Sequence, residues 1–312
     1  MEKKANSFIL RKIGREQNDN MLKILKESPI ASGGMQIGFH RYPDIFLAPG
    51  LFSEHLECAG FFHRKELLGF AILSYQNVYV NGIPQTVMYY SNAHVKKEGR
   101  GKGFFYKTSN LFFVDIYKNS NLGYAVVMKQ NQAAEKFIGK QKAGYPNLPY
   151  SIEISKLKVM NIIITSRKKE SKAYQIRKAN MKDIDCIAFL IQQENSKRLF
   201  APVMDKAVFK KNLKKRPNFD ISNYYVAEKE NKIVGVCAAW DTGIFKQNII
   251  LQYGLKLKMI KLFHSVAACF FRWPPLPKAG ETIKDVTITE YAAENRNPDI
   301  LKALLIKIYN DF

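Results

Sequence analysis

The stretch that decides the fold is YSNAHVKKEGRGKGFF, from Tyr90 to Phe105. Its first half, through Val95, has the residue types of a strand, and its glycine-rich second half leads into an apolar helix pattern. The first amides of a helix have no partner inside the helix, and the helix dipole adds partial positive charge at that end. Arg100 and Lys102 add full positive charges. We therefore predict that this turn binds an anion, such as a phosphate group.

The spacing of the glycines excludes two common phosphate-binding motifs. A Walker loop has Ser or Thr after its Lys, whereas Gly103 follows Lys102 here, and a dinucleotide fingerprint needs a third glycine that is missing. The turn instead resembles the Arg/Gln-x-x-Gly-x-Gly/Ala signature of the GNAT superfamily of N-acetyltransferases, with Arg100 in the first place and Gly103 in the central one. Phe105 stands where that signature has a small residue.

This resemblance implies a cofactor and a set of residues that bind it. Acetyl-CoA is the expected cofactor, the loop is expected to cradle its pyrophosphate, and the strand before the loop is expected to pair with its pantetheine arm. The residues implied on this strand and loop are Ala93, His94, Val95, Arg100, Gly101, Lys102, Gly103, Phe104 and Phe105.

A second half-motif follows, with Asn131 placed 31 positions after Arg100. Residues 124–128 are expected to form a buried strand that leads into a helix. The order resembles the family's Asn-x-x-Ala-x-x-Tyr/Phe helix, and Asn131 and Ala134 match it by position. The resemblance implies that both residues belong to the cofactor site, and that the two strands splay apart around the thioester. Asn131 is also a suitable helix N-cap.

Composition places this motif in a basic, globular protein. The chain has 312 residues, enough for two domains, and a hydrophobic content of 46%. Its net charge of +22 predicts acidic partners, including nucleic acid, unless the lysines are spread over every face. The cysteines are far apart and predict neither a metal site nor disulfides. With no secretory signal or transmembrane run, a cytoplasmic protein is expected.

Apolar periodicity predicts the remaining elements of the first half. Residues 18–25 are expected to form an amphipathic helix, and Asn81-Gly82 a type I′ hairpin turn. Residues 28–53 are expected to be irregular with a short helix; in the family this region forms the acceptor side of the site. Expected strands cover 8–13, 57–63, 67–80, 87–95, 151–155 and 157–164. The helix after the loop is expected to pack Phe105, Thr108, Phe112 and Ile116 on the sheet. Candidate acceptor contacts are His40, Arg41, Tyr42, Asp44 and His55.

The pattern then restarts, which predicts an internal duplication. Arg11 and Gly69 are 58 positions apart, and so are Arg177 and Gly235 in similar contexts. The expected fold is α/β (α+β): a GNAT-like, mostly antiparallel twisted sheet flanked by helices, in two related lobes. The expected domains are 1–166 and 172–312, with the polar run 166–171 between them.

The second lobe is expected to be degenerate. Its strand 286–291 comes late because of an insertion at 245–278, which is basic and amphipathic and either packs within the protein or lies on a membrane. When the lobes are aligned on Arg296, Asp299 takes the place of Gly103, and its carboxylate would repel a pyrophosphate. The lobe also stops at the equivalent of Ile116, so it is expected to be incomplete and to bind no CoA.

Three functions agree with these observations. The first is direct acetyl transfer from acetyl-CoA to a small-molecule or peptide amine in the first lobe, with His94 or Glu57 as the base. The resemblance implies a tyrosine acid where Phe137 stands, and Tyr145 is the candidate replacement. The second is a Fem-type aminoacyl transferase that uses charged tRNA. The third is a CoA-binding or nucleic-acid-binding relative without activity.

Overall fold

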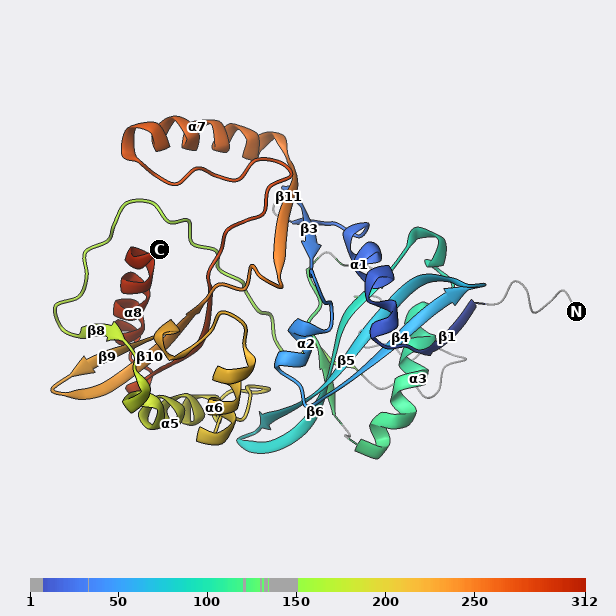
Figure 1. Ribbon diagram of the computed structural model, residues 1–312, viewed down its shortest axis with the longest axis horizontal. Coiled ribbons are helices and arrows are strands. Elements are labelled where there is room, and N and C mark those ends of the chain that lie inside the picture. Colours follow the sequence, from blue (N-terminus) through green and yellow to red (C-terminus); the bar gives the residue numbers. More distant parts are fainter. Residues whose placement is uncertain (1–7, 33, 120–121, 130, 132–133, 135–150) are drawn as a thin grey trace, which may run out of the picture. The chain divides into compact units, whose positions relative to one another are not determined.

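The computed structural model describes residues 8–32, 34–119, 122–129, 131, 134 and 151–312 (Figure 1). They form two compact units. Unit 1 holds the described residues of 1–29, 43–77 and 86–161, and unit 2 holds those of 30–42, 78–85 and 162–312. The expected domain 1–166 was contiguous, whereas segments 30–42 and 78–85 make their contacts with unit 2. The reason is long-range backbone pairing, because Met35–His40 pairs with Gln247–Tyr253 and Tyr79 pairs with Ala201.

Unit 1 contains a five-stranded sheet in the order β1-β4-β5-β6-β7. The β5–β6 turn has positive φ at both Asn81 (+52°) and Gly82 (+81°), which confirms the predicted type I′ hairpin. Neighbours β1, β4 and β5 are antiparallel, and β6 and β7 are parallel. The strands are β1 (Phe8–Lys12), β4 (His55–His63), β5 (Glu66–Val80), β6 (Ile83–Val95) and β7 (Gly123–Ala125). β7 is short and half-exposed, so the expectation of a buried strand at 124–128 was wrong.

Two helices of unit 1 bury apolar residues that recur at helical spacing in the sequence. α1 (Asn18–Lys26) buries four apolar residues, and α3 (Phe104–Asn119) packs on the core of the sheet. Because α3 begins at Phe104, Phe104, Thr108 and Phe112 share one buried face, and Tyr106 and Ser109 are also buried among its described side chains. Phe105, which was expected in the core, is half-buried, and the side chain of Ile116 lies outside the described residues.

Unit 2 contains a second sheet, in the order β12-β10-β9-β8. Apolar side chains of α8 (Pro298–Asp311), among them Leu304, form its core together with strand residues such as Cys237. Two further helices, α5 (Ile184–Asn195) and α6 (Lys206–Lys215), follow the first strand. The strands are β8 (Gln175–Lys178), β9 (Tyr224–Lys229), β10 (Lys232–Trp240) and β12 (Thr287–Ala293).

The first three strands pair in the same register in the two sheets, which agrees with the predicted duplication. Arg11 pairs with Gly60 and Arg177 with Val226; Gly60 then pairs with Phe70, and Val226 with Val236. The offset between equivalent residues is therefore 166 throughout these strands. It rises to 198 between β6 and β12, which corresponds to an insertion of 32 residues in unit 2.

The insertion belongs to a third sheet, in the order β11-β3-β2. It comprises β2 (Ile30–Ser32), β3 (Met35–His40) and β11 (Gln247–Tyr253), and α7 (Leu255–Phe271) follows β11. The expectation of an irregular region at 28–53 was therefore wrong for 30–40, although the short helix is present as α2 (Leu47–Leu51). Residues 151–164, expected as strands, form no helix or strand in the structure, because no described strand offers them a ladder partner.

Candidate functional site

The glycine-rich loop lies between β6 and α3 and has the backbone that its glycines allow. A short helical turn at Lys97–Gly99 is closed by the Gly99 amide, which donates to the Lys96 carbonyl at 3.1 Å. Gly101 (φ +73°) and Gly103 (φ +80°) then adopt the left-handed conformation, which residues with a Cβ rarely adopt. A Cβ at Gly101 would meet no atom within 4 Å, so the loop leaves open space at that point.

Exposed side chains give this loop a positive charge. Lys97, Arg100 and Lys102 are exposed, and the Lys102 Nζ lies 5.8 Å from the centre of the Phe8 ring. Lys96 instead pairs with Glu66 at 2.9 Å, and this hydrogen bond lowers the pKa of Glu66. Since α3 begins directly after Gly103, its first amides add to the positive potential. The geometry suits the binding of a phosphate-bearing group.

Strand β6 carries a feature that the sequence analysis missed. Asn92 has φ +49° in the middle of the strand, a conformation typical of a β-bulge, and asparagine tolerates it better than most residues. The pairing of β6 with β7 ends at Tyr90 and Ala125, just before the bulge. Among the described residues, segment 91–95 therefore has no β7 partner. This agrees with strands that separate at the loop.

His94 lies on the sheet face opposite α3. Its ring is 5.6 Å from that of the fully buried Phe70. Along the same face, Tyr89 and Tyr124 stack at 4.7 Å, and the Tyr124 hydroxyl donates to Gln76 Oε1 at 2.7 Å. Burial raises the pKa of both tyrosines, so their hydroxyls stay protonated at neutral pH. Neither tyrosine was predicted as a site residue, because both lie in ordinary strand patterns.

The structure does not bring Glu57 and His94 together. Strand alternation places Glu57 with Ala59 and Phe61 on the face covered by α3. Its carboxylate pairs with Lys12 at 3.1 Å and lies 3.5 Å from His55.

The other predicted residues occupy several places. Asn131 Oδ1 accepts from the Ala134 amide at 3.2 Å, as a helix cap does. Phe137 and Tyr145 lie outside the described residues. In unit 1, Asp44 pairs with the Arg15 guanidinium.

Three of the candidate acceptor contacts, His40, Arg41 and Tyr42, belong to unit 2. The Arg41 guanidinium donates to the carbonyls of His40 at 2.6 Å and Gln247 at 3.5 Å, and burial lowers the pKa of Arg41 to about 10. The Tyr42 amide donates to the Gln247 side chain at 3.2 Å. These contacts give Arg41 and Tyr42 a structural role where β3 meets β11.

The equivalent loop of unit 2 is shorter. Eight residues, 96–103, separate β6 from α3, whereas four residues, 294–297, separate β12 from α8. The residue directly before the helix is Gly103 in unit 1 and Asn297 in unit 2. Asn297, and not Asp299 as predicted, is therefore the equivalent of Gly103. Asn297 Oδ1 accepts from the Asp299 amide at 2.9 Å and so occupies the helix N-terminus. Arg296 bonds to Glu194 at 3.2 Å.

The bulge is repeated in unit 2, where a buried carboxylate with two hydrogen-bond donors occupies it. Glu290, equivalent to Asn92, has φ +47°, and β12 passes it with two residues opposite Cys237. Buried Arg216 and the Tyr224 hydroxyl both donate to the Glu290 carboxylate. Burial opposes the charge on Arg216, but Glu290 outweighs it and raises the pKa of Arg216. Unit 2 thus has an ion pair where unit 1 has Asn92.

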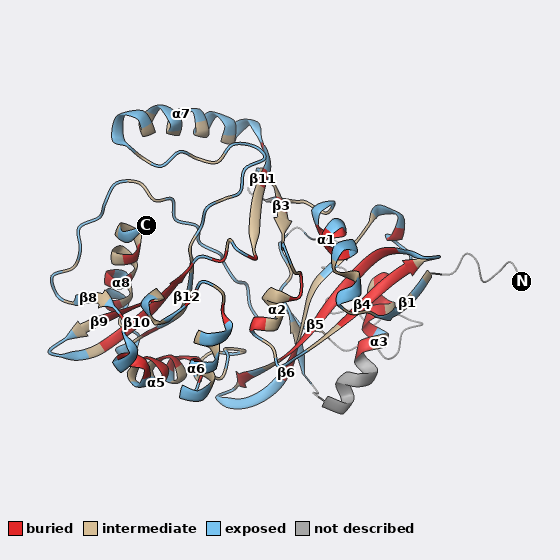
Figure 2. Ribbon diagram, viewed as in Figure 1, coloured by how far each residue is buried: buried red, intermediate tan, exposed pale blue. Residues whose placement is uncertain are grey.

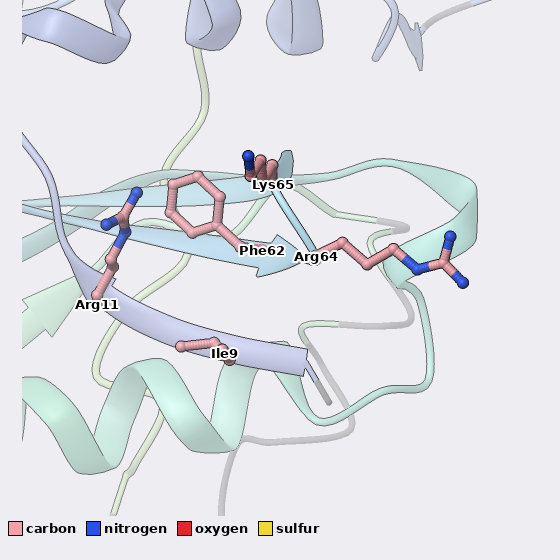
Figure 3. Close-up of a pocket in the computed structure, with 5 residues that line it drawn as sticks. All are labelled: Ile9, Arg11, Phe62, Arg64 and Lys65. Atoms are coloured by element: carbon pink, nitrogen blue, oxygen red, sulfur yellow. The ribbon is translucent and has the colours of Figure 1, made fainter. Parts of the chain in front are cut away.

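A basic pocket of about 450 Å³ lies at the edge strand β1 (Figure 3). The buried Phe62 lines it, and the Arg11 guanidinium lies 4.5 Å from the centre of that ring. The equivalent of Arg11 in unit 2, Arg177, is paired with Asp183 and Glu228. The pocket is lined by Ile9, Arg11, Phe62, Arg64 and Lys65, none of which was predicted as a site residue.

Comparisons with known proteins identify the fold. No protein-family model and no curated protein sequence matches the chain. Among solved structures, it is similar to Saccharomyces cerevisiae N-myristoyltransferase with bound myristoyl-CoA, with a TM-score of 0.50 and 16% identity over 98% of this chain and 73% of that chain. A probable N-acyltransferase of unknown function from Enterococcus faecalis is 12% identical over 91% of this chain and 71% of its own, with a TM-score of 0.44. An aminoglycoside N-acetyltransferase in complex with CoA covers half of this chain (50%) and 95% of its own, at 17% identity and a TM-score of 0.36.

The first of these structures spans nearly the whole chain, and its fold agrees with the mostly antiparallel sheets flanked by helices described above. The chain therefore has the GNAT fold, and the order of the first four strands of the unit 1 sheet is repeated in unit 2.

Proposed function

We propose that the protein is an N-acyltransferase that moves an acyl group from acyl-CoA to a primary amine, with acetyl-CoA as the expected donor. The observation that carries this proposal is the loop 96–103 of unit 1, which combines two left-handed glycines, open space beside Gly101, exposed cations and a following helix N-terminus. The solved relative with myristoyl-CoA supports a CoA thioester as the donor.

In this proposal the loop and β6 divide the binding of the donor between them. The amides of Gly103 and Phe104 and the side chains of Arg100 and Lys102 hold the pyrophosphate. Backbone groups of 93–95, which have no β7 partner among the described residues, pair with the pantetheine arm and polarise the thioester carbonyl. Bound acyl-CoA supplies the activated acyl group.

The proton transfers are assigned to residues on the face opposite α3. His94 takes the proton of the attacking amine, directly or through water. Tyr89 and Tyr124 lie on the same face, and we assign one of them to give a proton to the leaving thiolate. The raised pKa of each keeps its hydroxyl protonated for that step. Tyr145 stays a prediction. Glu57 is assigned no transfer here, because it lies on the other face of the sheet.

Calorimetric titration of acetyl-CoA and CoA into wild type and Gly103→Asp tests the donor site. Wild type is expected to bind at one site per chain, and the variant is expected to lose binding because its carboxylate faces the pyrophosphate. Gly280→Asp is the control: Gly280 has a similar φ (+90°) to that of Gly103 (+80°) but lies in unit 2, so the same residue at a similarly strained backbone position is expected to leave binding unchanged. Absence of binding by wild type would refute the proposal and favour a test of charged tRNA and other RNA.

Release of free CoA thiol with a panel of primary amines tests the reaction. His94→Ala is expected to lower kcat by about 10²–10⁴-fold, the usual contribution of a general base, while CoA binding is retained. A variant with unchanged kcat would remove His94 from the mechanism without affecting the donor site.

A further inference from the structure

Helix α7, in the insertion of unit 2, exposes an unusual amount of apolar surface. None of its 17 residues is buried (Figure 2). Phe263 is 68% exposed and Phe270 80%, and isolated exposed residues of this size are common, but a contiguous set is not. The large apolar residues of α7 that are more than half exposed are Leu255, Met259, Ile260, Leu262, Phe263, Val266, Phe270 and Phe271.

Six of these residues form one stripe. At 3.6 residues per turn, they fall within an arc of about 100° on the helix surface. Lys256 and Lys258 lie on the two sides of this arc. We call this surface the α7 stripe; it consists of Leu255, Met259, Leu262, Phe263, Val266 and Phe270.

The opposite side of α7 is held by its own chain. The Lys261 ammonium donates to the Pro277 carbonyl at 2.6 Å, and the His264 ring lies 5.7 Å from that of Trp273. At the start of the helix, the Gly254 amide donates to the Gly34 carbonyl at 2.7 Å. The helix is thus fixed to the β11-β3-β2 sheet and the returning segment 273–277, and the α7 stripe faces away from both.

The charge around the stripe has one sign. Residues 255–280 contain no Asp or Glu, and they contain five cations: Lys256, Lys258, Lys261, Arg272 and Lys278. A second copy of the helix would therefore bring like charges together without an acid to neutralise them. A surface that is both apolar and anionic complements the stripe and its flanking lysines.

We propose that α7 binds an anionic lipid bilayer by lying in the plane of its surface, with the α7 stripe among the acyl chains and the lysines at the headgroups. Phe271 and Trp273 add aromatic rings at the level of the interface. Of the helices in the described part of the chain, none has the length and hydropathy that a membrane crossing requires, so in-plane binding is the form proposed.

Sedimentation of the full chain with vesicles tests this proposal without any acyl-CoA. Wild type is expected to bind vesicles of equal parts phosphatidylcholine and phosphatidylserine, and to bind phosphatidylcholine alone much more weakly. Phe263→Glu is expected to reduce binding about tenfold or more, because a charge would take the place of the large apolar ring proposed to enter the bilayer. Phe189→Glu is the matched control, since Phe189 is 58% exposed on α5, also in unit 2. Lys256→Gln combined with Lys258→Gln is expected to weaken the salt-sensitive part of binding.

Two results would overturn the proposal. One is that the wild-type protein does not bind the anionic vesicles, or that the Phe263→Glu variant binds them as well as the wild type does. The other is a wild-type dimer in analytical ultracentrifugation that Phe263→Glu, but not Phe189→Glu, dissociates, because the α7 stripe would then be a contact between copies.

Discussion

Two glycines at equivalent places let the strands before the loops approach their neighbours. A Cβ at Gly69 would lie 2.8 Å from the carbonyl oxygen of His94, and a Cβ at Gly235 would overlap the Ile300 side chain. The equal spacing of these glycines predicted the duplication. That close packing requires a glycine at both places was not predicted, because the partners come from distant strands and helices.

Replacing Gly69 with alanine is therefore expected to destabilise the protein. The new methyl group must displace the backbone at His94, and overpacking of this kind costs about 1–3 kcal/mol in the free energy of unfolding. Urea unfolding followed by circular dichroism measures the change. Gly50→Ala is the control, because its Cβ would make only an ordinary contact with Leu56 at 3.5 Å. Equal stability of the two variants would contradict the close approach at His94.

Some residues of the candidate site were predicted from the sequence and others were not. The loop and its glycines were predicted from their spacing, and the structure gives them the backbone that an anion site needs. The bulge at Asn92 was not predicted, because one left-handed residue leaves no trace in hydrophobic periodicity. Asp299 was aligned with Gly103 because the different lengths of the two loops cannot be read from the sequence.

Among the secondary-structure elements, the start of α5 depends on an ion-pair network. The Asp183 carboxylate accepts from Arg177 at 2.7 and 3.0 Å and from the Asn180 amide at 2.8 Å. Glu228 on β9 accepts from the same guanidinium. In unit 1, Gln17 and Phe62 stand at the equivalent places, which leaves Arg11 to line the pocket of Figure 3.

This network predicts a pH dependence of stability. Its hydrogen bond to Arg177 lowers the pKa of Asp183 below the ordinary value of 3.8. The folded protein therefore binds this proton more weakly than the unfolded chain does. The stabilisation is fully present above the ordinary pKa and is lost as the pH falls through the lowered one.

Asp183→Asn is accordingly expected to lower the free energy of unfolding at pH 7 by about 1–3 kcal/mol, and by less near pH 3. Urea titrations at the two pH values measure this. Asp185→Asn, in an exposed pair with Lys206, is expected to change stability by about 0–1 kcal/mol at pH 7. A loss for Asp183→Asn that is the same at both pH values would show that the charge is not its cause.

Elements were predicted well where their patterns are local. β1, α1, β4 and the β5–β6 hairpin lie close to their expected ranges. The region 28–53 was expected to be irregular because it contains Gly33-Gly34 and Pro43, yet residues 35–40 form a strand that pairs with β11. Residues 151–164 show the reverse case: their alternating pattern suits a strand, but a strand also needs a partner.

For the molecule as a whole, the duplication separates two units with the same topology and different loops. Unit 1 has the eight-residue loop and Asn92 at the bulge, whereas unit 2 has a four-residue loop and the Arg216–Glu290 pair. The repeat and its insertion were predicted from the sequence. That segments 30–42 and 78–85 belong to unit 2 was not predicted, because pairing between residues so far apart in the chain has no local signature.

If unit 1 alone binds CoA, hydrogen exchange will show it within one experiment. Saturating CoA is expected to slow the exchange of amides in residues 91–107 and to leave those of 289–301 unchanged. Unit 2 serves as the internal control, since both segments join a bulged strand to a helix. Equal protection of both segments would contradict a silent second unit.

The β3–β11 pairing also bears on how the chain is made. Residues 35–40 leave the ribosome early, but their partner strand ends at Tyr253, more than 200 residues later. At roughly 5–20 residues per second, β3 waits roughly 10–45 s for the strand that completes its sheet. During synthesis this segment is therefore an open strand edge, and a nascent-chain chaperone that shields residues 30–42 until β11 emerges would serve the protein more than one that acts on the finished chain.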